Sequence, residues 1–192
     1  MNDDFLQHLG PRSRLLRVAS SLFYEQGYHA TGINQIIREA QVAKASFYDH
    51  FTSKEDLAVT YLEQRRERWL QLLATSTASF ATPRDRVLGL FGFLETWVTE
   101  TNFRGCAFLN IASEFPTTEN RIRATVAAHK DAQWHFFHNL VKDISQEQSE
   151  ALVCSQTHTL YLLFESALVE SRTFRSVWPV QAAREALARA LA

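Results

Sequence analysis

The spacing of apolar residues along the chain predicts helices and no strands. Apolar side chains recur three or four residues apart over most of the 192 residues, which places them on one face of a helix. Glycine and proline fall between these segments, where helices begin or end. The expected helices cover residues 11–26, 33–40, 43–50, 53–73, 83–101, 106–114, 119–144, 145–172 and 179–192. The predicted fold class is therefore all-α.

Polar residues mark several helix starts. Ser53 with Asp56, and Thr82 with Asp85, have the spacing of capping pairs, in which a hydroxyl accepts a hydrogen bond from the backbone three residues on. Residues 75–82 are rich in serine, threonine and alanine and are expected to form a linker at a domain boundary.

Two of the short helices form a hairpin near the N-terminus. The first carries an apolar stripe at Ile33, Ile36, Ile37 and Ala40. Thr31 is expected to cap its free N–H groups, and Val42 to fill the turn. In the second helix, Phe47 and Phe51 lie on one side. Two helices joined by about three to four residues form a helix-turn-helix, whose second helix can enter the major groove of DNA. A helical hairpin without a nucleic-acid partner is the alternative.

The residues on the outer face of the second helix favour the DNA-binding interpretation. Lys44, Ser46, Tyr48 and His50 can all donate hydrogen bonds to phosphate. Tyr48 is a large aromatic residue at a position that the apolar stripe does not require.

The segment around this helix resembles the signature of TetR-family transcriptional regulators. The resemblance rests on the run S-F-Y-D-H-F-x-S-K-E-D-L at residues 46–57, with its Tyr-x-His-Phe core, and on A-x-x-L-F-x-x-x-G-Y at residues 19–28. It covers roughly residues 12–60. Two residues depart from the pattern, because the family often has glycine where Gln41 and Ala45 stand. A non-glycine residue in a left-handed turn costs about 1 kcal/mol, so Gln41 suggests a slightly different turn.

The resemblance implies a homodimeric regulator, most often a repressor, that binds a palindromic double-stranded DNA operator and is released by a small-molecule inducer. Residues 1–52 would form the DNA-binding domain, 53–74 a connecting helix, and 83–192 the ligand-binding and dimerisation domain. The residues expected nearest base edges are Lys44, Ala45 and Ser46. The residues expected at phosphates are Thr31, Tyr48, His50 and Lys54.

The resemblance implies a ligand cavity between helices of the second domain. Bulky aromatic residues with interspersed polar groups are what such a cavity requires, but a helical core explains most of these aromatic residues equally well. The expected lining residues are Trp97, Cys106, Phe108, Trp134 and Tyr161. The last two long helices would form the dimer interface, with Leu160, Leu163, Phe164 and Leu168 facing the partner.

The formal net charge of the chain is −1, which by itself argues against a nucleic-acid partner. The distribution of charge matters more. Between His8 and Lys54 there are six basic and three acidic residues, which leaves +3, doubled in a dimer. This field is modest, so affinity should rest on individually placed contacts.

Two further clusters allow more than one interpretation. Cys106 opens a short helix next to Arg104, a setting that stabilises a thiolate, so it is either a sensor of oxidants or electrophiles or a small buried apolar residue. Asp131, His135 and His138 share one helical face and could approach a metal, but hydrogen-bonded histidines are the commoner case. We expect no metal and no cofactor.

Other function classes are disfavoured. The chain has no phosphate-binding loop and no nucleophile–base motif, so we do not expect an enzyme. It has no apolar run near 18 residues, no signal-peptide core in its first ten residues and no disulfide framework, which favours the cytoplasm. The remaining alternative to a DNA-binding regulator is a helical ligand-binding or scaffold protein.

Overall fold

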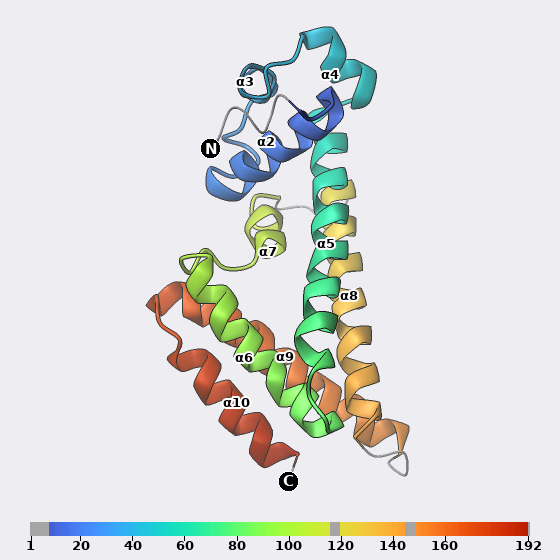
Figure 1. Cartoon of the computed structure of the whole chain (residues 1–192), viewed down its shortest axis with the longest axis vertical. Coiled ribbons are helices and arrows are strands. Elements are labelled where there is room, and N and C mark those ends of the chain that lie inside the picture. Colours follow the sequence, from blue (N-terminus) through green and yellow to red (C-terminus); the bar gives the residue numbers. More distant parts are fainter. Residues whose placement is uncertain (1–7, 116–119, 145–148, 192) are drawn as a thin grey trace. The chain divides into compact units, whose positions relative to one another are not determined.

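The computed structural model describes residues 8–115, 120–144 and 149–191. In these ranges all regular structure is helical, which confirms the predicted all-α fold (Figure 1). The helices are α2 (Pro11–Glu25), α3 (Ile33–Glu39), α4 (Lys44–His50), α5 (Lys54–Ala78), α6 (Pro83–Glu100), α7 (Ala107–Ala112), α8 (Arg121–Lys142), α9 (Glu150–Phe174) and α10 (Trp178–Ala190). None of the helices in this described part of the chain has the length and hydropathy needed to span a membrane.

The two predicted capping pairs are confirmed. The Asp56 amide donates to the Ser53 hydroxyl over 3.0 Å at the start of α5. The Asp85 amide likewise donates to the Thr82 hydroxyl over 3.1 Å at the start of α6. These bonds satisfy backbone donors that have no partner inside the helix.

The predicted linker at 75–82 is wrong over its first half. Helix α5 continues to Ala78. The hydroxyls of Ser76 and Thr77 donate to the Leu73 carbonyl over 2.9 and 3.0 Å, and Thr77 is buried. The hydroxyl residues that suggested a linker therefore bond back to their own helix.

The chain divides into two compact units that are not continuous in sequence. The first unit comprises the residues up to Arg66 together with Ala107–His129, and the second comprises Glu67–Cys106 and Lys130–Ala192. Helices α5 and α8 therefore contribute residues to both units. The functional division expected from the sequence, with boundaries at 52, 74 and 83, stays a prediction.

The core of the first unit is built around α2, which packs against both α3 and α4. The side of α2 that faces inward carries Leu15, Leu16, Val18, Ala19, Leu22 and Phe23, all buried. Ile36 of α3 and Phe47 of α4 are also fully buried. The hairpin is thus held to the rest of its unit by a continuous apolar contact, which leaves the opposite face of α4 exposed.

The core of the second unit is built by α6, α9 and α10, which contact one another in pairs (Figure 1), together with residues of α5 and α8 that belong to the same unit. Its largest fully buried side chains include Phe91 from α6 and Phe164 from α9, whose rings meet edge to face at 5.9 Å. Leu160 and Leu168 of α9 belong to the same core.

Candidate DNA-binding interface

The turn between α3 and α4 is tight and uses a residue that seldom adopts such a conformation. Gln41 has φ 52°, in the left-handed region. The Val42 amide donates to the Ile37 carbonyl over 3.2 Å and closes the turn. A glutamine here costs about 1 kcal/mol relative to glycine, so packing of the two helices must compensate. The turn therefore keeps its left-handed residue even though Gln41 stands where the family often has glycine.

Helix α4 separates buried from exposed side chains clearly. Phe47 is completely buried and contacts Phe51 at 6.1 Å between ring centres. Lys44 and Ala45 are exposed, and Tyr48 has 49% of its surface exposed. His50 is also exposed, whereas Ser46 is partly buried. The helix thus presents the residues expected at DNA on its outer face, and their contacts with DNA stay predictions.

Thr31 does not cap α3, contrary to prediction. The residue at the cap position is Gly32, with no side-chain hydrogen bond to the helix. Thr31 is fully buried, and its hydroxyl donates to the Gly27 carbonyl over 2.7 Å. A hydroxyl that is buried and already bonded is not available to a phosphate, so Thr31 is better described as part of the turn at residues 27–31.

Lys54, expected at a phosphate, instead holds this turn. Its Nζ donates to the carbonyls of Tyr28 and Thr31, both over 3.0 Å, and lies 4.1 Å from the centre of the Tyr28 ring. Burial lowers the pKa of Lys54, and the Glu114 carboxylate opposes that shift. The ammonium group is therefore bound mainly to main-chain oxygens of its own unit.

Glu114 binds the same turn through its amides. The Tyr28 and His29 amides each donate to one carboxylate oxygen of Glu114, both over 2.7 Å. Gly27 just before them has φ 96°, and a Cβ there would lie 2.9 Å from Glu114 Oε1. Sequence analysis missed Glu114, because it lies more than 80 residues from the turn and no spacing motif connects them.

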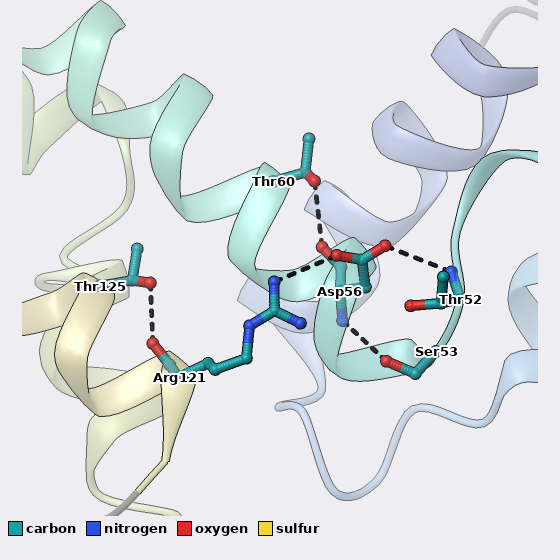
Figure 2. Close-up of polar contacts among 6 residues, drawn as sticks. All are labelled: Thr52, Ser53, Asp56, Thr60, Arg121 and Thr125. Atoms are coloured by element: carbon teal, nitrogen blue, oxygen red, sulfur yellow. Dashed lines mark hydrogen bonds and ion pairs between the residues drawn. The ribbon is translucent and has the colours of Figure 1, made fainter.

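The N-terminus of α5 is fixed by a second polar group, drawn in Figure 2. The Asp56 carboxylate accepts from the Thr52 amide over 3.2 Å and from Arg121 of α8 over 3.2 Å. The Thr52 hydrogen bond is the main reason that the pKa of Asp56 is lowered, with burial opposing it and Arg121 adding to it. Arg121 and Glu114 thus both join residues after Cys106 to the helix-turn-helix region.

In the second unit, polar side chains form a connected cluster. Lys130 forms an ion pair with Glu165, and its Nζ lies 3.7 Å from Cys106 Sγ. Gln133 donates to the other Glu165 oxygen over 2.7 Å and accepts from the indole N–H of Trp69 over 2.7 Å. We call these five residues the polar cluster.

The charges of the polar cluster shift the pKa values of Lys130, which belongs to it, and of Tyr161, which lies near it. Burial lowers the pKa of Lys130, but the Cys106 sulfur and the Glu165 carboxylate outweigh it, so the pKa is raised. Burial and Glu165 together raise the pKa of Tyr161, which places this phenol in the field of the same cluster. The cluster therefore has a cation, a carboxylate, an amide and a thiol on neighbouring side chains.

The structure brings only some of the expected lining residues together. Trp97, Cys106 and Tyr161 pack against the core of the second unit. Phe108 does not, because it is buried in the first unit and stacks on His129 at 3.5 Å between ring centres. Trp134 lies beside His138, at 5.0 Å between ring centres.

The expected dimer residues need correction. Leu160, Phe164 and Leu168 are buried inside the protomer core, so they are not free to face a partner, whereas Leu163 packs only partly against that core. The large apolar residues that α9 and the start of α10 leave exposed are Leu152, Leu162, Val169, Phe174 and Trp178. The helical period was correct, but three of the four expected residues lie on the inner side of the helix.

The alternative metal group of Asp131, His135 and His138 is not assembled in the structure. His135 Nδ1 lies 2.9 Å from the carbonyl oxygen of Asp131, one turn earlier in the same helix. His138 instead contacts Glu150 of α9, with 3.0 Å between Nε2 and Oε1.

Comparison with known proteins identifies the type of the N-terminal segment. Residues 15–60 match the model described as "Bacterial regulatory proteins, tetR family". Residues 15–60 thus form a TetR-type segment. The chain is 36% identical to the regulator LmrA of Bacillus subtilis over 85 residues, which is 44% of each chain. The chain thus spans less than half the length of this curated relative.

Two other regulators match over almost the whole chain. The transcriptional repressor NemR of Escherichia coli is 25% identical over 185 residues, 88% of each chain. A TetR-family regulator from Streptomyces coelicolor has a solved structure with a TM-score of 0.84 and 26% identity, covering 94% of each chain. The helical architecture of this chain is therefore similar to that of the Streptomyces coelicolor regulator over nearly its whole length.

Proposed function

We propose that this chain is a homodimeric transcriptional regulator that reads operator DNA with α4 and releases it when a small molecule binds the second unit. The observation that supports this most is the outer face of α4, where Lys44, Ala45 and Tyr48 are exposed while Phe47 anchors the helix. Lys44, Ala45 and Ser46 would approach base edges, and Tyr48 and His50 phosphates. Repression is the more common mode in the family.

The homodimer would form through α9 and the start of α10. Leu162 and Val169 are seven residues apart on α9 and lie on one face, and Leu162 has 65% of its surface exposed. Phe174 and Trp178 continue the apolar surface, with 5.2 Å between their rings. A two-fold dimer places two α4 helices on half-sites one helical turn apart, about 34–36 Å, which implies a palindromic operator.

The effector would bind at the polar cluster of the second unit. A ligand with an apolar body and a polar group could pack on Trp97 and Tyr161 and compete for Lys130 or Glu165. It would release DNA only by binding the DNA-incompetent state more tightly. Helix α5 contributes Lys54–Arg66 to the first unit and Glu67–Ala78 to the second, so it is the element proposed to carry a coupling of about 1–3 kcal/mol.

In vitro selection tests the DNA-binding proposal without knowledge of the natural operator. The full chain is incubated with a library of random duplexes, and bound DNA is amplified and sequenced over several rounds. We expect an inverted repeat to be enriched, with half-sites about one helical turn apart. Enrichment of nothing above the input library would favour the alternative of a helical ligand-binding or scaffold protein.

A second form of the effector is suggested by the 3.7 Å separation of Cys106 Sγ and Lys130 Nζ. The Cys106 thiolate could add to the β-carbon of an α,β-unsaturated carbonyl compound, forming a C–S bond while the α-carbon takes a proton. In that case Cys106→Ser would abolish DNA release by the electrophile and leave DNA binding intact. Release by non-reactive apolar compounds only would favour reversible binding instead.

A further inference from the structure

Three metal-binding side chains meet where the end of α8 passes the beginning of α9 in the second unit. They are His138 of α8 with Glu150 and Cys154 of α9. His138 Nε2 lies 3.0 Å from Glu150 Oε1 and 4.0 Å from Cys154 Sγ, and Cys154 Sγ lies 3.8 Å from Glu150 Oε1. Glu150 and Cys154 are four residues apart, so one face of α9 presents both.

These separations are close to those of a tetrahedral zinc site. With Zn–S about 2.3 Å and Zn–N or Zn–O about 2.0–2.2 Å, ligand atoms at tetrahedral angles lie about 3.3–3.7 Å apart. The three observed separations differ from this range by a few tenths of an ångström, which a side-chain rotation can absorb. Imidazole, thiolate and carboxylate are also the three ligand types that zinc uses in proteins.

We propose that His138, Glu150 and Cys154 form a binding site for a borderline-soft divalent cation, Zn²⁺ in the first place. A neutral imidazole, a thiolate and a carboxylate carry two negative charges, which balance the cation. The Cys154 thiol releases its proton to solvent as the S–Zn bond forms, and water completes the tetrahedron. The cation would thereby join α8 to α9.

The surroundings of the three residues suit this role. The His138 side chain is only 13% exposed, whereas that of Glu150 is 67% exposed, so a cation can enter from solvent on the Glu150 side. The Trp134 ring stacks on the His138 ring, with 5.0 Å between centres and 27° between planes. This stacking orients the imidazole, and it places an indole fluorophore next to the proposed metal.

Titration of the full chain with Co²⁺, a spectroscopic substitute for zinc, tests the site. We expect saturation at one equivalent per chain, with a sulfur-to-cobalt charge-transfer band in the near ultraviolet and the visible bands of a tetrahedral ion. Added Zn²⁺ should displace Co²⁺, because zinc binds more tightly than cobalt at such sites. The charge-transfer band and the visible bands should then both disappear. Cys154→Ser should lose the charge-transfer band, and His138→Gln and Glu150→Gln should weaken binding by at least tenfold.

The chain offers matched controls for these variants. Cys106→Ser removes the other cysteine, and His135→Gln removes a histidine of the same helix that bonds elsewhere. Both should keep the charge-transfer band and the affinity. If the wild type shows no thiolate band and no binding below about 1 mM, or if Cys106→Ser loses the band while Cys154→Ser keeps it, the proposal is overturned. The wild-type spectrum still tests the proposed site if a variant at one of its three residues fails to fold.

Discussion

Each unit contains an acidic and a basic residue that make long-range contacts, and the two pairs bind different kinds of partner. In the first unit, Lys54 and Glu114 bind the main chain of the turn at residues 27–31, one at its carbonyls and the other at its amides. In the second unit, Lys130 and Glu165 bind each other and neighbouring side chains. Main-chain bonds fix a backbone conformation, whereas side-chain bonds can be exchanged for bonds to a ligand.

This difference matches the roles proposed for the two units. A DNA-reading element must be held in one geometry, and the turn at residues 27–31 leads directly into α3 of the helix-turn-helix. An effector site must be able to rearrange, and the polar cluster has a cation and a carboxylate that a ligand could bind instead. The predictions below test this contrast, from the largest expected effect to the smallest.

The largest effect should come from breaking the mostly buried ion pair of the second unit. Glu165→Leu leaves the Lys130 ammonium without its carboxylate and Gln133 without an acceptor, so the free energy of unfolding should fall by about 3 kcal/mol. Urea denaturation measures the change. The double variant Lys130→Met, Glu165→Leu should recover most of the loss, since no charge is then left buried. A loss below about 1 kcal/mol in the single variant would mean that the pair is effectively solvated.

Removing the carboxylate at the turn of the first unit should have the next largest effect. Glu114→Ala leaves the Tyr28 and His29 amides without their charged acceptor, which should lower the free energy of unfolding by about 2 kcal/mol. Hydrogen exchange should accelerate at these two amides more than elsewhere. The exposed Glu63→Ala is the control and should leave both readouts unchanged. Unchanged protection of the Tyr28 and His29 amides in Glu114→Ala would contradict the proposed role of Glu114.

Gly27 offers a finer test of the same contact. Gly27→Ala should cost about 1–2 kcal/mol, from the left-handed backbone and from the approach of its Cβ to Glu114. In a double-mutant cycle with Glu114→Ala, the steric part should vanish while the backbone part remains. Strict additivity of the two changes would show that the Cβ and the carboxylate do not meet.

The smallest expected effect concerns pH and the cap of α5. Because the pKa of Asp56 is lowered in the folded state, its contribution to stability is present above the unfolded pKa of about 3.9 and is lost as pH falls through the folded value. Asp56→Asn should therefore reduce stability by about 0.5–1 kcal/mol at pH 7, and the difference from wild type should shrink in acid below pH 4. Urea denaturation at both pH values measures it. An equal difference at pH 7 and in acid would exclude ionisation of Asp56 as the cause.

Features that depend on residues close together in the sequence were predicted, whereas features that depend on contacts between distant segments were not. The helices, the caps at Ser53 and Thr82 and the exposed face of α4 follow from spacing within a few residues. The turn at residues 27–31 does not, because its partners Lys54 and Glu114 come from distant segments. Thr31 was assigned to the cap of α3 from its position before the apolar stripe, and it was a candidate for a phosphate contact; in the structure Gly32 occupies the cap position and Thr31 is fully buried.

The two faces of α9 illustrate a second limit of prediction from the sequence. Apolar residues at helical spacing occur on both the inner and the outer side of this helix. Periodicity identifies the helix but does not tell which stripe packs within the protomer, and the choice of Leu160, Phe164 and Leu168 was the inner one. The His138–Glu150–Cys154 group was missed because its members belong to two helices and meet only after folding.

Fluorescence anisotropy on a selected duplex tests most directly whether α4 is the DNA reader. Wild type, Lys44→Ala and Tyr48→Ala are titrated with the selected duplex, with variants of it changed at single base pairs, and with an unrelated duplex, each at several salt concentrations. We expect Tyr48→Ala to weaken binding to all duplexes alike, because phosphate contacts carry no base information. We expect Lys44→Ala, at a residue placed near base edges, to flatten the preference at one position of each half-site. If both variants bind every duplex as wild type does, α4 does not touch DNA and the proposed function fails.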